Sequence, residues 1–431
     1  MVKLFLAMSQ LNPQNVIDNL IELQALTGNA DGSQRPAWSE NWLKACDWLR
    51  QKLASLPVEI EVDQAGNTWA TLKGVIPQAL VLGSHIDSVA DGGWLDGCLG
   101  VLSALEILRR FASEGIPPVT IRLVSWADEE GTQFGPSLFG SSAVSGNFDP
   151  NYLGQLTDKN GSRLEEVVAR YGVDIQHAKE AGNQLNNVSA YLELHIEQGP
   201  VLESLDKPLA AVTGALGVER HSIRFTGQAA HAGSTPMAMR RDALAAAAKL
   251  ALEIRDIAKR NGGVCTIGSV VTRPGIDTAV VAECDCLLDQ RNLDAAALAR
   301  MFQEAKEASQ RFAAEERVEV EWKRLYQIEP VSFNPQLIDL CDESIVETCG
   351  VGQRMPSGPL HDAVEMARAG VPTAMMFVQS LNGLSHTKEE DTRPEHLLLA
   401  VQTFDRLAAK TIAWILRNNR ADAALRTGHF G

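Results

Sequence analysis

The stretch that decides the fold runs from residue 79 to residue 126 and reads ALVLGSHIDSVADGGWLDGCLGVLSALEILRRFASEGIPPVTIRLVSW. It begins and ends with short runs rich in Val, Ile and Leu, at 79–83 and 119–126, which predict buried strands. Between them a leucine recurs every third residue from Leu99 to Leu108, so a helix is expected over 97–111. Strand, helix and strand in succession indicate an α/β sheet with parallel or mixed pairing.

The same style continues on both sides of this stretch. Before it, we expect helices from Asn12 to Gly28 and over 38–56, and strands over 58–62 and 69–72. After residue 326, we expect a helix over 335–349, a strand over 372–378 and a terminal helix around 398–416. Both ends of the chain therefore contribute to one α/β domain.

A different pattern interrupts this domain. Strands are expected over 221–226, 264–271, 279–288 and 318–322, and helices over 240–259 and 294–314. The order β-α-β-β-α-β is typical of a ferredoxin-like arrangement. We therefore predict a discontinuous domain, residues 1–211 and 327–431, with a central mixed β-sheet flanked by helices, and an inserted α+β domain over 212–326.

Composition excludes several classes of protein. The chain has 431 residues, enough for two or three domains, and a formal charge of −15, which disfavours nucleic-acid and anionic-membrane partners. Its apolar runs are too short for a transmembrane helix, and its first residues make a weak secretory signal. Seven cysteines with no C-x-x-C pair favour a reducing cytoplasm over a disulfide framework.

Polar residues directly follow the strand at 79–83. His85 and Asp96 are candidate metal ligands, and Asp87 could hold the other nitrogen of the His85 ring. The alternative is an ordinary polar loop. The strand at 119–126 runs into Asp128-Glu129-Glu130, where repulsion between three acids would be relieved by a cation. The alternative there is a solvated acidic turn.

Two further histidines complete a possible ligand set. His195 lies in LELHIEQGP (192–200) and His386 in LSH (384–386), and either could be a structural histidine. Together with His85, Asp96 and Glu130 they suffice for two metals that share one carboxylate. Nitrogen and oxygen ligands without thiolate suit zinc, manganese, cobalt or nickel.

The motifs now carry a specific resemblance. In order along the chain stand GSHIDSV, GGWLDGCLGV, WADEEGTQFG, LELHIEQGP, TGQAAHAGSTPM, LDQR, HDA and LSH. This series resembles the di-zinc aminoacylase/carboxypeptidase superfamily, in its hydantoinase/carbamoylase branch. That branch includes N-carbamoyl-L-amino acid hydrolases, β-ureidopropionases and allantoate amidohydrolases.

The resemblance implies two divalent metal ions per subunit, with zinc expected first. One would take His85, Asp96 and His195, and the other Asp96, Glu130 and His386. Glu129 would be the general base toward the water that bridges the metals. The discontinuous domain would then be the di-metal catalytic domain, and the inserted one a lid and dimerisation domain.

The resemblance also implies roles in substrate binding. His231 of the inserted domain would reach the active site of a second subunit and stabilise an oxyanion, which implies a homodimer. Arg291 would clamp a substrate carboxylate. The residues Gln198, Gly358 and His361 match positions near the substrate.

The chain departs from the family pattern in this recognition shell. Thr278 stands where a second Asn is expected, and Pro359-Leu360 replace a small Ala-Gly. Gln133 stands where Arg is common. The substrate is therefore less determined than the reaction.

We accordingly expect a metal-dependent amidohydrolase acting on a small-molecule amide. It would cleave a linear C–N bond of an N-carbamoyl or related N-acyl amino acid, or of a small carboxylate-bearing amine, through a metal-bridging hydroxide. The alternatives are an N-acyl or N-formyl amidohydrolase, a dipeptidase with an unusual substrate, or an inactive binding protein on the same fold.

Overall fold

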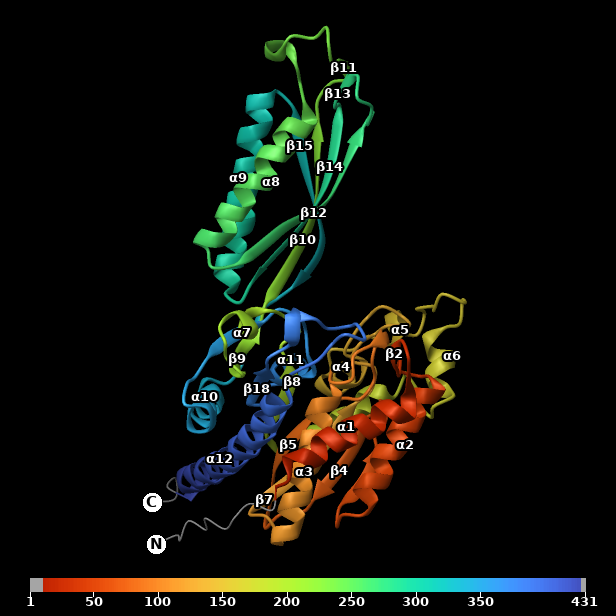
Figure 1. Cartoon of the computed structure of the whole chain (residues 1–431), viewed down its shortest axis with the longest axis vertical. Helices are drawn as coiled ribbons and strands as arrows, with labels where there is room; N and C mark the ends of the chain where they lie inside the picture. The colour runs from red at the N-terminus through yellow and green to blue at the C-terminus, as the bar shows by residue number, and fades with distance from the viewer. Residues whose placement is uncertain (1–10, 428–431) are drawn as a thin grey trace. The chain divides into compact units, whose positions relative to one another are not determined.

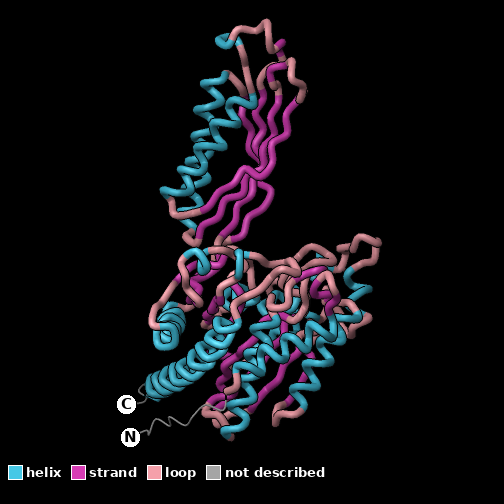
Figure 2. The backbone as a smooth tube through the Cα atoms, in the orientation of Figure 1, coloured by secondary structure: helices cyan, strands magenta, loops and turns pink. Residues whose placement is uncertain are grey.

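The computed structural model describes residues 11–427, with side chains up to residue 420. They form two compact units, each with its own sheet and helices (Figures 1 and 2). The first unit joins the chain up to Thr213 with the chain from Phe333 onward, and the second runs from Gly214 to Ser332. The second unit ends later than the expected residue 326 because its last long strand continues to Ile328.

The first unit is built on a mixed sheet with the order β9-β18-β8-β5-β7-β4-β3. Its strands are β3 (Glu59–Val62), β4 (Thr68–Leu72), β5 (Ile76–His85), β7 (Val119–Trp126), β8 (Val188–Ile196), β9 (Leu209–Ala215) and β18 (Thr373–Val378), with β17 (Arg354–Ser357) paired to β9. The strands β18, β8, β5 and β7 run parallel, whereas β9, β4 and β3 run antiparallel to their neighbours. The predicted mixed α/β sheet is confirmed.

Helices flank this sheet (Figure 1). They are α1 (Pro13–Thr27), α2 (Glu40–Ala54), α3 (Cys98–Glu114), α4 (Phe139–Ser145), α5 (Pro150–Leu153), α6 (Leu164–Ala169), η1 (Ala178–Leu185), α7 (Val201–Ser204), α10 (Pro335–Cys349), α11 (Asp362–Arg368), η3 (Leu381–Gly383) and α12 (Pro394–Thr427). A small separate sheet is formed by β1 (Gly28–Asn29) and β2 (Gly32–Gln34), which lie between α1 and α2, and by β6 (Ala90–Gly92), which precedes α3. The leucine face of α3 is fully buried, as its spacing predicted.

Parallel pairing sets the place of the chemistry. His85 at the end of β5 lies opposite Trp126 at the end of β7, and β8 ends at Ile196 beside them. The carboxyl ends of these strands therefore meet at one edge of the sheet, where the polar segments that follow each strand come together.

The second unit is a four-stranded antiparallel sheet with two helices. Its elements are β10 (Gly217–Thr226), α8 (Ala243–Arg260), β12 (Val264–Arg273), β14 (Glu283–Asn292), α9 (Ala295–Glu316) and β15 (Glu319–Ile328), with the short η2 (Met237–Met239) before α8. The strand order β12-β14-β10-β15 is ferredoxin-like. Cys284 and Cys286 lie in its apolar core, as expected of structural thiols.

One strand prediction in this unit is wrong. The run expected as a single strand over 279–288 is split into β13 (Ala279–Val280), which pairs with β11 (Ala230–His231), and β14. Between them Val281 accepts from the N–H of Ala243 at the start of α8, and Ala282 accepts from the N–H of Gly227. These bonds take the backbone out of the ladder, so the strand breaks.

The two chain segments that enter and leave the second unit pair with each other. β16 (Val331–Ser332) lies antiparallel to the end of β9, with Val331 opposite Ala215 and Ser332 opposite Gly214. Of the helices that the structure describes, none has the length and apolar character needed to cross a bilayer.

Candidate metal centre and active site

The ends of β5 and β8 and the residue before the N-cap of α3 bring three candidate ligands together. Nε2 of His85 lies 3.5 Å from Oδ1 of Asp96, and Nε2 of His195 lies 3.0 Å from the same oxygen. All three side chains are buried. Imidazole nitrogens and a carboxylate at this spacing form a donor set that suits zinc and similar divalent ions.

A second group shares Asp96. Its Oδ2 lies 3.3 Å from Nε2 of His386, which lies 3.4 Å from Oε2 of Glu130. In each group the ligand atoms lie within 4.8 Å of one another, and elsewhere in the described chain no three His, Cys, Asp or Glu side chains do so. Asp96 thus offers one carboxylate oxygen to each group.

Backbone carbonyls fix the two buried rings. Nδ1 of His85 lies 3.1 Å from the carbonyl oxygen of Asp87, and Nδ1 of His195 lies 2.9 Å from that of Ile196. Each ring can donate through Nδ1 to its carbonyl, which leaves Nε2 directed toward Asp96. The Asp87 carboxylate, expected to hold the other nitrogen of the His85 ring, lies at ion-pair distance from it, with Oδ1 3.7 Å from Nδ1.

The Asp87 carboxylate also orders the acidic turn after β7. Its two oxygens accept from the backbone N–H of Glu129, at 3.3 Å, and of Glu130, at 3.2 Å. These bonds fix the backbone from which the candidate base Glu129 and the candidate ligand Glu130 project.

Gly97 lets the His85 ring approach the start of α3. It has a positive φ of 63°, and a Cβ there would lie 2.4 Å from Cε1 and Nδ1 of His85. Any other residue at this position would displace the ring.

The charge balance of the cluster fits cations. Burial and the neighbouring Asp96 raise the pKa of Glu130 to about 7, and its buried Oε1 bonds to no described residue. Burial opposes ionisation of Asp96, but His195, His386 and His85 together hold its pKa well below the usual range. The hydrogen bond with Asp96 raises the pKa of His386 to about 9.

In this state imidazole protons offset part of the carboxylate charge. Divalent cations compete with those protons for the same nitrogen and oxygen atoms. The five side chains therefore fit two divalent ions in place of the protons.

Glu129 faces the first group. Its Oε2 lies 3.7 Å from Nε2 of His85. Burial raises the pKa of Glu129 well above its usual range, and Glu130 and Asp87 add to this against the attraction of His85. A carboxyl that readily accepts a proton beside two candidate ligand groups is suited to general base work.

A hollow of about 230 Å³ opens on this cluster. Its walls are formed by Asp96, Glu129, Glu130, Ser137, His195, Gln198, Pro359, Leu360, His361 and His386. Pro359 and Leu360, which depart from the family pattern, thus line the hollow. Gly358 precedes them and lies outside this lining, so its expected contact with substrate stays a prediction.

His361 packs against the metal-ligand candidate His195. The ring centroids are 4.4 Å apart, and Nε2 of His361 is buried without a partner among the described residues. Burial and the neighbouring His195 lower the pKa of His361 well below its usual range, so its ring is neutral. A neutral imidazole in the wall of the hollow is suited to a hydrogen bond with a polar substrate atom.

Gln198 lies within the cluster. Its Nε2 donates to Oδ2 of Asp96 at 2.8 Å and to Oγ of Ser385 at 3.2 Å, and its backbone is left-handed with a φ of 58°. The approach to His386 Nε2 is 3.2 Å. A left-handed backbone at a residue other than glycine is strained, and such residues cluster at functional sites, where the surrounding structure holds them.

Two residues that support Asp96 were not predicted from the sequence. Oε1 of Glu390 accepts from the backbone N–H of Leu95 and of Asp96 at 3.0 and 3.1 Å, and its Oε2 accepts from Ser385 at 2.8 Å. Oγ of Ser385 also lies 3.1 Å from Oδ2 of Asp96, so the one hydroxyl proton can go to either carboxylate. The available signal was the acidic run that follows His386, which by itself reads as solvated surface.

Three predicted site residues lie in the second unit. Nδ1 of the exposed His231 accepts from the N–H of Gly233 and of Ser234, both at 3.1 Å. In the neutral ring the proton is therefore on Nε2, which makes this atom a donor. The carbonyl of Thr278, in the loop between β12 and β13, accepts from the N–H of Ala232.

The Arg291 side chain, on β14, is hydrogen-bonded to a neighbouring carboxylate. Its Nε and Nη2 donate to the carboxylate of Asp289 at 2.8 and 3.3 Å, and Arg220 donates to the same carboxylate. Asp289 thereby fixes the plane of the Arg291 guanidinium.

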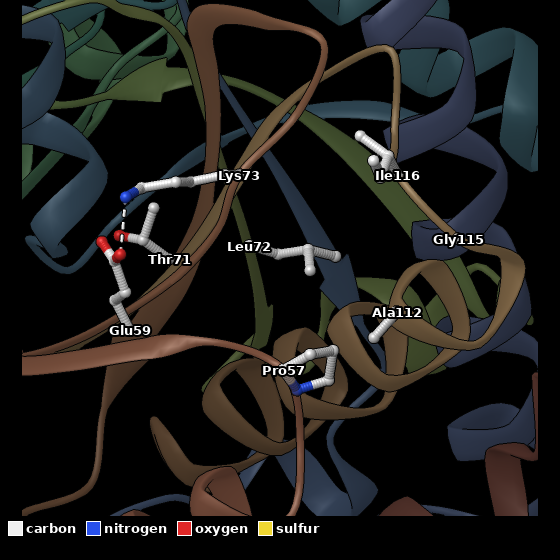
Figure 3. A pocket seen from close by; sticks show the side chains of 8 residues that line it. All are labelled: Pro57, Glu59, Thr71, Leu72, Lys73, Ala112, Gly115 and Ile116. Carbon is white, nitrogen blue, oxygen red and sulfur yellow. Dashed lines mark hydrogen bonds and ion pairs between the residues drawn. The ribbon is translucent and has the colours of Figure 1, made fainter.

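A larger hollow, of about 440 Å³, lies away from this chemistry (Figure 3). It lies toward the amino end of β7, since Leu72 in its wall pairs with Ile121. Figure 3 shows apolar side chains around it and the ion pair of Lys73 with Glu59, with no histidine among the residues drawn. It offers no catalytic set.

Comparison with known proteins agrees with the site. Residues 81–410 match the model of peptidase family M20/M25/M40. An N-carbamoyl-L-amino acid amidohydrolase of Geobacillus stearothermophilus is 33% identical, over 83% of this chain and 88% of that protein. An allantoate amidohydrolase of Escherichia coli K12 is 32% identical, over 89% of this chain and 94% of that protein.

A solved structure is similar over nearly the whole length. An amidase of the hydantoinase/carbamoylase family from Burkholderia multivorans superposes with a TM-score of 0.84 at 30% identity, covering 93% of this chain and 98% of that one. The chain belongs to peptidase family M20/M25/M40, in its hydantoinase/carbamoylase branch. It is a hydrolase that acts on carbon–nitrogen amide bonds.

Proposed function

We propose that this chain hydrolyses the linear amide C–N bond of an N-carbamoyl amino acid or of a related N-acyl, carboxylate-bearing amine. The observation that carries the proposal is the pair of ligand groups that share Asp96, with Glu129 in the wall of the same hollow. Relatives named as N-carbamoyl-L-amino acid and allantoate amidohydrolases support this substrate class.

Five side chains would hold two divalent ions, of which zinc is our first choice. His85 and His195 with Asp96 would hold one, and Glu130 and His386 with Asp96 the other. Bound there, the ions would polarise the scissile carbonyl and acidify water.

Glu129 would accept the proton of the attacking water and pass it to the leaving nitrogen. Its raised pKa makes the protonated form accessible during the reaction, and its place beside His85 keeps it near the cluster. His361 and Gln198 would orient the amide through hydrogen bonds from the wall of the hollow.

Residues of the second unit would complete recognition. The donor Nε2 of His231 would stabilise negative charge on the carbonyl oxygen, in the active site of a second copy of the chain. Arg291, held by Asp289, would bind the substrate carboxylate, with Thr278 altering the shape of that clamp.

This role of His231 requires a homodimer through the second unit. β12 lies at an edge of its sheet and exposes Val264, Val270 and Val271. An edge strand of this kind is a template for pairing with another chain. Sedimentation of the purified protein tests it: we expect a dimer, and a monomer at micromolar concentration would contradict it.

The substrate class is tested by separate assays of ammonia and free amine. We expect ammonia release from N-carbamoyl amino acids, at rates at least about tenfold above those for N-formyl and N-acetyl analogues. Formate or acetate release without any ammonia would favour the N-acyl alternative. No turnover by zinc- or manganese-loaded protein on any of these, or on dipeptides, would favour an inactive binding protein.

A further inference from the structure

The acidic turn after β7 depends on one residue with an unusual backbone. Asp128 has a φ of 56°, in the left-handed region, and the side chains of the next two residues separate from there. Glu129 approaches His85, whereas Glu130 approaches His386. A left-handed backbone is unfavourable for residues other than glycine, so the surroundings must hold Asp128 in place.

A buried tryptophan supplies that hold. Nε1 of Trp38 donates to Oδ2 of Asp128 at 2.8 Å, and both side chains are about 3% exposed. The indole N–H thus satisfies a buried carboxyl oxygen that is shielded from water. Through this hydrogen bond the Asp128 side chain is held by a turn that lies 90 residues earlier in the sequence.

The indole is itself held in a fixed place. Trp38 packs on Trp42, with ring centroids 4.8 Å apart, and on Phe139 and Tyr171 at 5.4 and 6.0 Å. Its own backbone is left-handed, with a φ of 61°. The preceding carbonyl, of Ala37, accepts from the side chain of Gln133.

The bond therefore joins two conformationally restricted residues. Main-chain bonds hold the rest of the turn, since Asp128 accepts from the N–H of Phe139 at 3.0 Å. They fix where the turn lies, while the indole N–H fixes the rotation of the Asp128 side chain and, with it, the left-handed backbone.

We propose that Trp38 is a positioning residue: its hydrogen bond to Asp128 aims Glu129 at the reacting centre. The proposal rests on the proposed role of Glu129 as general base. The described partners of the Trp38 side chain are Asp128 and three aromatic rings, and Trp38 does not line the hollow. We therefore expect it to act on the rate of proton transfer and not on binding.

The chain provides a matched control. Trp42 neighbours Trp38, is 4% exposed, and its Nε1 bonds to no described residue. Trp38→Phe and Trp42→Phe both shrink a buried indole in the same aromatic cluster, but only the first removes a hydrogen bond. Their difference isolates the bond from the loss of packing.

We expect Trp38→Phe to lower kcat about 10- to 100-fold relative to Trp42→Phe, the size of effect that a small displacement of a catalytic group produces. KM and the metal content per chain should stay within about twofold of the control. Asp128→Ala should resemble Trp38→Phe, and Asp128→Asn should lose less, because Asn keeps an acceptor and tolerates a left-handed backbone.

A second measurement does not depend on activity. In an NMR spectrum of the protein, the indole N–H signal that disappears in Trp38→Phe identifies Trp38 among the eight tryptophans. In Asp128→Ala this signal should shift upfield and exchange faster with solvent, while that of Trp42 should stay in place. An unchanged Trp38 signal would overturn the bond.

The activity results separate this inference from the proposed function. If Glu129→Gln is inactive while Trp38→Phe and Trp42→Phe have equal kcat, Glu129 keeps its role and the positioning role of Trp38 is refuted. If Trp38→Phe loses metal in proportion to activity, Trp38 acts through the fold, which also refutes it. If wild-type protein has no hydrolase activity, the proposed function fails whatever the indole signals show.

Discussion

Glu129→Gln is expected to lower kcat by at least about 10³-fold while the protein keeps its metal ions. The carboxylate and the amide have nearly the same shape, so the change removes proton acceptance and leaves the packing beside His85 intact. A 10³-fold loss corresponds to about 4 kcal/mol of transition-state free energy. The measurement is kcat by ammonia release, with metal content measured on the same preparation.

Glu106→Gln is the matched control. Glu106 is also a buried glutamate, but it lies on α3, where it accepts from the N–H of Asn12 and from Asn15. Its replacement should lower stability and leave kcat per folded chain unchanged. Turnover by Glu129→Gln within tenfold of the wild type would remove Glu129 from the proton transfer.

Asp96→Asn is expected to abolish binding at both metal positions. Asp96 offers one oxygen to each ligand group, and an amide is a much weaker ligand than a carboxylate. Metal content should fall from about two ions to less than one per chain, and turnover to background. Added zinc should raise the melting temperature of the wild type, because ligands that bind the native state stabilise it, and should not raise that of the variant.

Asp63→Asn controls for the loss of a buried carboxylate. Asp63 is buried and accepts from Asn67 and from the Trp69 indole, outside the ligand groups. The folded fraction of this variant should bind as much metal as the wild type. Full metal content in Asp96→Asn would mean that the ions bind to other residues of the chain.

The sequence predicted the elements of the fold well where hydrophobic periodicity is strong. The strand over 119–126 and the helix over 335–349 have the expected bounds, because each is a continuous apolar or amphipathic run between clear stop signals. The break between β13 and β14 was not predictable from apolar content. It arises from backbone bonds to Ala243 and Gly227, which lie far from it in the sequence.

The site shows the same division. His85, Asp96 and Glu130 follow strand ends whose parallel pairing brings them to one edge, so their convergence could be anticipated. The sequence alone did not show that Glu390 and Ser385 support Asp96, or that Trp38 bonds to Asp128. Those contacts join segments that no local pattern relates.

Asp87 has partners that its spacing did not suggest. A carboxylate two residues after a ligand histidine predicted an interaction with the His85 ring, and Oδ1 lies 3.7 Å from Nδ1. The same carboxylate also accepts from the backbone N–H of Glu129 and of Glu130. The hydrogen-bond partner of Nδ1 is the Asp87 carbonyl.

We expect five side chains at one hollow to hold two divalent ions. Anomalous diffraction from crystals of the zinc-loaded protein, recorded on both sides of the zinc absorption edge, tests it most directly. We predict two zinc peaks, one contacted by His85, Asp96 and His195 and the other by Asp96, Glu130 and His386. No peak within coordination distance of Asp96, at full zinc loading of the protein, would contradict the account.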